Sequence, residues 1–143
     1  MTIARPASEQ SRAKARATAK IKVRDSAARP YDQSAGPALA EIHLSEIFTG
    51  DLEGESEVRA LEMQRDDKSA VLVSLQRFCG RLAGRQGSFV LQGAEKVTDG
   101  KISATWSVVP GSGTGELAGL RGEGGFDGRF GQGSDGVLEY WFE

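Results

Sequence analysis

The sequence predicts an all-β protein in which eight antiparallel strands run up and down and close into one β-barrel. Three observations lead to this fold class. Apolar and polar residues alternate in short runs, and turn signals separate the runs roughly every twelve residues. The stretch 110–125 also holds seven of the chain's 19 glycines, as a tight turn between strands would. We expect closure because a closed sheet leaves no unpaired edge strand.

The first four strands are predicted at residues 18–24, 39–49, 55–64 and 70–79. In the first, Ile21 and Val23 lie on one side and basic residues on the other, which is the alternation of a half-buried strand. Two prolines and a glycine predict a loop over 27–37. Residues 39–64 are rich in Ala, Leu and Glu, which leaves a helix open there as well.

The last four strands are predicted at residues 87–94, 102–109, 120–130 and 137–142. Glycines predict the turn over 80–84, and the sequence Thr-Asp-Gly predicts another over 98–100. The strand at 120–130 is expected to be irregular because glycines interrupt it.

The glycine-rich stretch could be read in two ways. Gly113 to Ala118 satisfies G-x-G-x-x-A, and Asp135 lies about twenty residues further on, as in a dinucleotide-binding fingerprint. Such a site needs a helix that begins at the glycines, and the glycines that follow leave no room for one. We therefore predict a structural turn. Its residues are Gly111, Gly113, Gly115, Glu116, Gly119, Arg121 and Gly122.

Residues 17–143 are predicted to form one barrel domain, and residues 1–16 a basic, disordered extension. Residues 1–24 carry seven basic side chains against one acid, so the remainder has 11 basic and 19 acidic residues, a net charge of −8. The N-terminal extension lacks the apolar core of a secretory signal peptide. Its Arg-rich, acid-poor composition also fits an organelle transit peptide, but we expect a cytoplasmic protein.

The composition argues against several function classes. An acidic body does not suit a nucleic-acid-binding face, and no apolar run approaches the length of a membrane-spanning helix. A single cysteine, Cys79, and a single histidine, His43, exclude an internal disulfide and a two-histidine zinc site. We expect a buried Cys79, a surface His43, no metal and no cofactor, and neither nucleic acid nor a membrane as a partner.

Four stretches and the glycines after them carry a family resemblance. They are residues 29–32 (RPYD), 48–55 (FTGDLEGE), 84–92 (GRQGSFVLQ) and 106–109 (WSVV). From Thr18 onward the chain resembles a bacterial family of uncharacterised small proteins, a domain of unknown function. Members of that family look like allene oxide cyclase in fold, a calycin-like barrel with an apolar interior. The glycine pattern is also similar to those of dirigent proteins and barrel-shaped spirotetronate cyclases.

The resemblance implies a cofactor-free barrel that holds an apolar or polyene-like small molecule, and it implies no particular reaction. The chain departs from the family's pattern at three positions. Ser26 stands where a tryptophan is usual, Gln76 where a glutamate is usual, and Gly93 where a histidine often follows the Leu-Gln pair. The last two departures remove titratable groups, which weakens an acid–base mechanism that rests on those positions.

Six side chains are candidates for the wall of a ligand site: Trp106, Gln76, Glu46, Glu62, Phe89 and Phe78. Trp106 fits either an aromatic wall or ordinary core packing. Gln76 becomes a hydrogen-bond donor in the cavity if its strand face points inward, which the sequence leaves open. Glu46 and Glu62 could act as a general acid or base inside the barrel, or could simply face water.

The favoured function is a cofactor-independent cyclase or isomerase, because a barrel cavity can hold a flexible apolar substrate in a reactive conformation. A non-catalytic, lipocalin-type carrier is the main alternative, and a structural oligomer with a filled barrel is a third. No catalytic residue is assigned. We expect a homo-oligomer, most plausibly a dimer, that buries outer strand faces.

Overall fold

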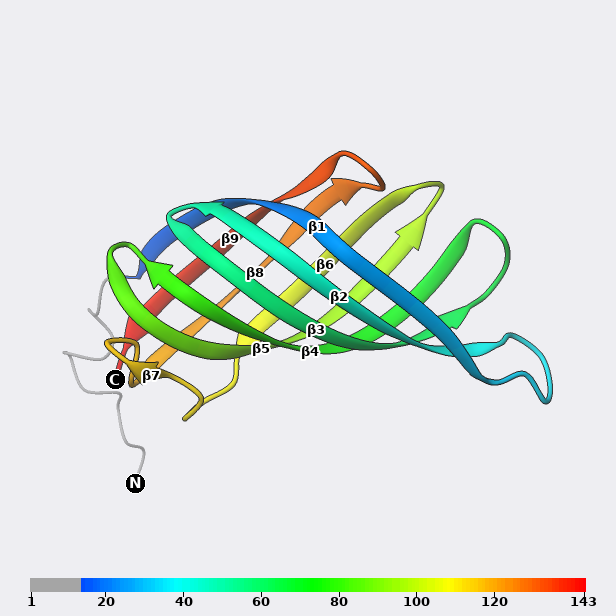
Figure 1. Cartoon of the computed structure of the whole chain (residues 1–143), viewed down its shortest axis with the longest axis horizontal. Helices are drawn as coiled ribbons and strands as arrows, with labels where there is room; N and C mark the ends of the chain where they lie inside the picture. The colour runs from blue at the N-terminus through cyan, green and yellow to red at the C-terminus, as the bar shows by residue number, and fades with distance from the viewer. Residues whose placement is uncertain (1–13) are drawn as a thin grey trace, which may run out of the picture.

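The computed structural model of this chain describes residues 14–143, and all of its regular structure is β-strand (Figure 1). The strands are β1 (Ala15–Asp32), β2 (Leu39–Gly50), β3 (Leu52–Gln64), β4 (Ser69–Leu82), β5 (Arg85–Thr98), β6 (Lys101–Val108), β7 (Thr114–Gly115), β8 (Leu120–Arg129) and β9 (Gly133–Phe142). Eight long strands close into an antiparallel barrel, which confirms the predicted fold class, and the two-residue β7 is added beside β5. No helix that could cross a membrane occurs in residues 14–143.

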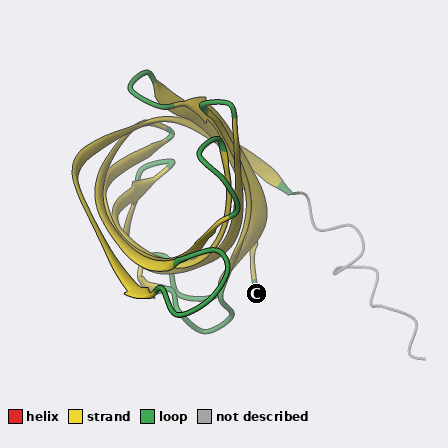
Figure 2. Cartoon of the chain, turned by 90° about the vertical axis from the view of Figure 1, so that its right-hand side faces the viewer, coloured by secondary structure: helices red, strands yellow, loops and turns green. Residues whose placement is uncertain are grey.

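The barrel closes with a stagger between its strands. Figure 2 shows the closed ring from one end. Following paired residues round the ring from Ala40 on β2 leads back to β2 at Gly50, ten residues further along (40 to 50). Such a stagger tilts the strands and sets the width of the interior. The interior therefore has two ends, each formed by turns from several strands.

We call these ends the closed end and the mouth. The closed end holds the β2–β3 and β4–β5 turns, the β7 loop and the C-terminus, at the left of Figure 1. The mouth is formed by the β1–β2, β3–β4, β5–β6 and β8–β9 turns. β1 pairs with β2 from Ala19 to Asp32 but with β9 only from Ala15 to Ile21. Towards the mouth, β1 therefore has a neighbour on one side only.

Several strands are longer than predicted. The predicted loop over 27–37 is wrong in its first half, because β1 continues to Asp32 and Pro30 pairs opposite Ala40 on β2. Proline is tolerated there because β1 has no partner on its other side at that point. The predicted turn over 80–84 is also too long, since β4 runs to Leu82. Gly80 lets two backbones meet, and a Cβ there would lie 2.2 Å from the carbonyl oxygen of Glu53.

The helix left open over 39–64 does not form, and β2 and β3 pair there as a hairpin. The alternation of burial along β3 explains this outcome, because Leu52, Ser56, Val58 and Ala60 are buried and the residues between them, apart from the half-buried Gly54, are exposed. A helix would have placed these residues on several faces. The predicted extension over 1–16 lies outside the described residues up to residue 13, and its last two residues begin β1.

The closed end contains the hydrophobic core. Its aromatic rings form a connected layer, in which the Phe48 and Phe78 ring centroids are 5.2 Å apart and those of Phe78 and Phe89 are 5.1 Å apart. Leucines surround this layer and are almost completely buried: Leu52, Leu82, Leu91, Leu117, Leu120 and Leu138. Packing at this density leaves no space for a ligand at the closed end.

The glycine-rich loop caps the closed end. Leu117 is completely buried beneath it, and the Leu117 amide donates to the carbonyl of Thr114 at 2.9 Å. Gly113 is required by a close approach, since a Cβ there would lie 2.0 Å from the carbonyl oxygen of Leu117. The Glu116 carboxylate accepts from the amide of Gln86 at 3.0 Å, which ties the loop to β5.

The other residues of the predicted turn lie in or beside this loop. Gly111, Gly115 and Gly119 have φ angles of +83°, +60° and +81°, a backbone region that favours glycine. Arg121 pairs with Glu143 at the C-terminus, and a Cβ on Gly122 would lie 2.9 Å from the carbonyl oxygen of Glu139. No helix begins at these glycines, so the fingerprint does not have the context that a dinucleotide would need.

Replacing Leu117 by alanine should destabilise the protein by about 2–5 kcal/mol, because it leaves a cavity under the loop. Urea unfolding would measure this loss. Leu61→Ala is the matched control, since Leu61 is 49% exposed and its truncation should cost less than about 0.5 kcal/mol. Equal losses of stability in the two variants would show that burial of Leu117 beneath the loop does not stabilise the closed end.

Candidate functional site

The half of the interior nearest the mouth is lined by a different kind of side chain. One row of paired inward residues crosses the barrel wall: Glu62, Leu72, Glu95, Ala104 and Phe126. These five side chains are only partly buried, unlike the core residues of the closed end. On β1, Val23 pairs with the inward Glu46 and is nevertheless 53% exposed. Solvent therefore reaches the interior on this side.

A polar cluster lies between the aromatic layer and the mouth. The Gln76 side-chain amide donates to Glu46 Oε1 at 2.6 Å and lies 2.6 Å from the Ser56 hydroxyl, and that hydroxyl donates to Glu46 Oε1 at 3.2 Å. All three side chains are buried, with Glu46 8% exposed. Within residues 14–143, the hydrogen bonds to Glu46 all end on Oε1, so the cluster fixes one oxygen and gives Oε2 no donor.

A second carboxyl group, that of Glu95, belongs to the inward face of β5. Glu95 Oε2 accepts from the Ser74 hydroxyl at 2.7 Å, whereas Glu95 Oε1 is buried without any hydrogen-bond partner. The carboxyl group folds back over Gly93, where a Cβ would lie 2.7 Å from Glu95 Oε2. Because Gly93 has no side chain, the Glu95 carboxyl group can occupy this position. A buried carboxylate oxygen without a donor is rare, and a ligand or water molecule would satisfy it.

Burial raises the pKa of both carboxyl groups. For Glu46, loss of hydration is the largest cause, the hydrogen bonds from Ser56 and Gln76 act against it, and the charge of Glu95 raises the pKa further. For Glu95, loss of hydration raises the pKa and the Ser74 hydrogen bond partly offsets it. Glu95 is thus close enough for its charge to act on the pKa of Glu46. A raised pKa brings a carboxyl group nearer to the range in which it can both accept and donate a proton.

The structure brings some of the predicted site residues together and separates others. Gln76 and Glu46 are in direct contact, and the face of β4 that carries Gln76 points inward. Glu62 also points inward but lies at the mouth, where a pocket of about 540 Å³ is lined by Glu62, Gln64, Ala70, Val97 and Phe130 among others. Glu62 takes no part in the hydrogen bonds of the Glu46 cluster.

The predicted aromatic residues lie in the core. Phe78 and Phe89 are completely buried, so a ligand could reach neither without repacking the closed end. Trp106 is 5% exposed, and its ring nitrogen donates to the carbonyl of Val137 at 3.1 Å. Phe126 extends the layer towards the mouth, with its centroid 5.4 Å from that of Trp106. Phe126 is the aromatic side chain best placed to contact a ligand.

Sequence reasoning missed Glu95, Ser56 and Phe126. Glu95 was hidden because the predicted strand ended at residue 94, although the alternation from Phe89 through Leu91 continues to Glu95. Phe126 lay in a stretch judged irregular for its glycines. In the structure those glycines lie in a regular strand that pairs with β6 and β9. Following the period-2 pattern through both stretches would have found these two residues.

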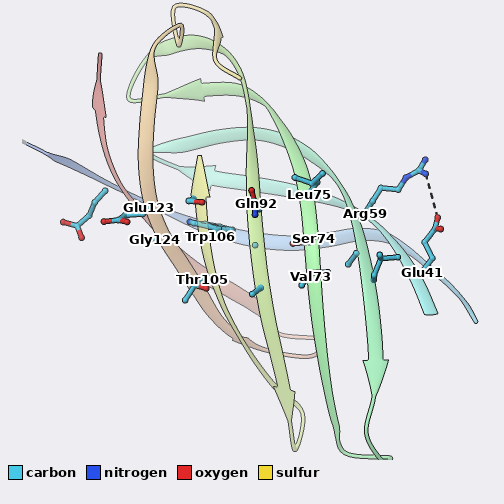
Figure 3. A pocket seen from close by; sticks show the side chains of 16 residues that line it. Glu41, Arg59, Val73, Ser74, Leu75, Gln92, Thr105, Trp106, Glu123 and Gly124 are labelled. Carbon is cyan, nitrogen blue, oxygen red and sulfur yellow. Dashed lines mark ion pairs between the residues drawn. The ribbon is translucent and has the colours of Figure 1, made fainter. Parts of the chain in front are cut away.

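A groove of about 1080 Å³ lies on the outside of the barrel (Figure 3). Most of its side chains belong to the outward faces of the strands, including Leu61, Val73 and Leu75, and the ion pair of Arg59 with Glu41 lies at one edge. The groove contains no buried polar cluster, so we assign the candidate site to the interior. The exposed apolar side chains suit the predicted homo-oligomer, which stays a prediction.

Two further predictions concern single residues. Cys79 is exposed, so the prediction of a buried thiol is wrong, because the outward face of β4 carries Cys79 while its neighbour Phe78 points into the core. His43 is half-buried on the outward face of β2 and contacts Glu41. Within residues 14–143, no three His, Cys, Asp or Glu side chains gather as metal ligands would.

Comparison with known proteins agrees with this geometry. Residues 15–143 match a family described as "Protein of unknown function (DUF3224)". The chain belongs to the DUF3224 family. This confirms the predicted membership of a bacterial family of uncharacterised proteins with a barrel fold. No curated protein matches the chain.

Among solved structures, the DUF3224 chain is similar to a protein of unknown function from the same family in Shewanella oneidensis MR-1. The two are 32% identical, with a TM-score of 0.72. The match covers 91% of this chain and 98% of the other. The barrel is therefore shared along nearly the whole length of both DUF3224 proteins.

Glu95→Gln should change how the stability of this DUF3224 protein depends on pH. The folded state raises the pKa of Glu95 above its ordinary value of 4.5, so at intermediate pH the unfolded state holds fewer protons than the folded one. The free energy of unfolding of the wild type should therefore fall, relative to the variant, as the pH rises from below 4.5 through the raised pKa.

Urea unfolding across this pH range would measure the difference. Glu53→Gln is the control, because Glu53 is exposed on the outward face of β3 and reports the general effect of losing one negative charge. If the two variants gave the same pH dependence, Glu95 would not be a desolvated carboxyl group.

Proposed function

We propose that this protein binds a small, largely apolar molecule in the mouth half of the barrel and isomerises or cyclises it by proton transfer, without a cofactor. The observation that supports this most is the pair of carboxyl groups on Glu46 and Glu95. Both point into the barrel interior, and each has an oxygen that receives no hydrogen bond from the described residues. An apolar pocket with a few convergent polar groups is the usual form of a small-molecule site.

The surrounding wall suits a ligand that is mostly hydrocarbon. Leu72, Ala104 and Phe126 belong to the same inward row as Glu95, and Ala104 leaves room between the larger side chains on either side. The aromatic layer seals the far side of this space, so a ligand enters from the mouth and stops at Trp106 and the Glu46 cluster. A rigid floor of this kind holds a flexible molecule in one conformation.

The carboxyl pair can move a proton without any other reactant. One group, as carboxylate, takes a proton from a carbon of the ligand, and the other, as carboxylic acid, gives a proton to a second position. The double bond shifts, the ligand keeps its formula, and no oxidant or reductant is consumed. Gln76 and Ser56 act as positioning residues, because their hydrogen bonds hold Glu46 Oε1 and so fix the orientation of the carboxyl group.

A lipocalin-type carrier is the second candidate, and the absence of a nucleophile favours it. The hydroxyl groups of Ser56 and Ser74 already donate to carboxylates, and the inward faces of the described strands carry no histidine or cysteine. Such an interior would bind a ligand and release it unchanged. Native mass spectrometry of the purified protein separates the two, because an enzyme returns an isomer of the added ligand and a carrier returns the same compound.

Filling the interior should abolish ligand binding. We expect one molecule of N-phenyl-1-naphthylamine, a neutral dye that fluoresces in apolar surroundings, to bind per barrel. Ala104→Phe should weaken its binding by at least about tenfold, since the new ring occupies the space beside Glu95. Ser103→Phe places the same ring on the outward face of β6 and should leave binding unchanged.

Fluorescence titration of the three proteins would measure this. Equal binding by all three, together with its loss in the groove variant Val73→Lys, would place the dye outside the barrel and contradict the proposed function.

A further inference from the structure

We propose that the ligand of the mouth half is a small organic cation, in which an ammonium group is attached to an apolar body. This inference rests on the proposed function and narrows the class of ligand. It is carried by the sign of the charges that line the interior, by the carboxylate oxygens left without donors, and by an aromatic ring beside them.

The inward charges near the mouth have one sign. Glu46, Glu62 and Glu95 point inward, and in the described strands no Lys, Arg or His shares their face in this half. Arg85 has the inward parity but lies at the closed end, over the ring of Phe142. A barrel that encloses three acids without a basic partner gains most from a ligand that brings positive charge.

One pocket at the mouth carries the same sign of charge. Among the described residues that line it, Lys68 is the one basic side chain, and Glu62, Asp67 and Asp99 are acidic. The lining of this pocket therefore has a net negative charge, whereas Arg65, Lys101 and Arg129 lie at the turns around it. A cationic ligand is attracted towards such an entrance and an anionic one is repelled.

The carboxylate oxygens are ready to accept hydrogen bonds. Glu46 is more than nine-tenths buried, and its Oε2 receives no donor from the protein. Glu95 Oε1 is buried and also receives none. An ammonium group carries up to three N–H donors and a positive charge, so it can donate to such an oxygen and offset the negative charge of the interior. An alcohol brings one donor and no charge.

An aromatic ring completes the environment of the cation. Ala104 pairs with Glu95 on one side and with Phe126 on the other, so these two residues flank one small side chain in the inward row. Phe126 packs against Trp106, which holds its ring in place. Aromatic faces attract ammonium groups, most strongly where water is partly excluded. The apolar body of the ligand would lie against Leu72 and this aromatic surface.

Isothermal titration with three probes of equal length tests the charge directly. The probes are hexylammonium, 1-hexanol and hexanoate, at about pH 8, where free carboxyl groups are ionised and the amine is protonated. We expect hexylammonium to bind at least about tenfold more tightly than hexanol, and hexanoate to bind weakest. Glu95→Gln should cost hexylammonium about tenfold in affinity and leave hexanol within about twofold.

Two further variants serve as controls for the effect of Glu95→Gln on the three affinities. Glu53→Gln removes an exposed, outward charge and should leave all three affinities unchanged. Glu62→Gln, at the solvent-accessible mouth, should weaken hexylammonium without affecting the fold, which thermal unfolding would check. Failure of all three probes to bind would overturn the proposed function itself. Binding of hexanol or hexanoate as tightly as hexylammonium would overturn only the inference that the ligand is a cation.

Discussion

The unequal pairing of β1 with its two neighbours divides the interior of the barrel into a closed half and a half that solvent reaches. Hydrogen bonds to both β9 and β2 close the ring around Ala19 and Ile21, and the interior beside them is packed with aromatic and aliphatic side chains. Beyond Ile21, β1 pairs with β2 alone. The wall is open there, and inward-facing residues such as Val23 meet solvent. A single sheet thus forms both a tightly packed closed end and a half near the mouth that solvent reaches.

In this half, desolvation and hydrogen bonding act in opposite directions on the charged forms of the carboxyl groups. Burial disfavours the charged forms of Glu46 and Glu95, while Ser56, Gln76 and Ser74 each stabilise a carboxylate oxygen. Neither group is fully satisfied, and an incompletely paired polar group in a core costs stability. Proteins keep such groups where function needs them, so the same imbalance that weakens the fold is what makes this interior a candidate site.

The fold could be predicted from the sequence because its signals are local. They are the alternation of apolar and polar residues along each strand and the turn residues between strands. The run from Ser56 to Ala60 shows this, since every second residue is buried although the composition also permitted a helix. The inward direction of Gln76 could not be obtained in this way, because both faces of β4 are apolar and only the closure of the barrel decides between them. The buried Glu95 depends on Gly93 and on Ser74 of the adjacent strand, a contact between strands that alternation alone does not reveal.

The location of a bound ligand is the central claim of this account, and alanine-methyl NMR tests it most directly. Ala60 and Ala104 point into the mouth half, whereas Ala94 points outward into the groove on the other side of the same wall. With hexylammonium added, intermolecular NOEs should reach the methyl groups of Ala60 and Ala104 and be absent at Ala94. NOEs to Ala94 alone would place the ligand on the outside of the barrel and contradict the account.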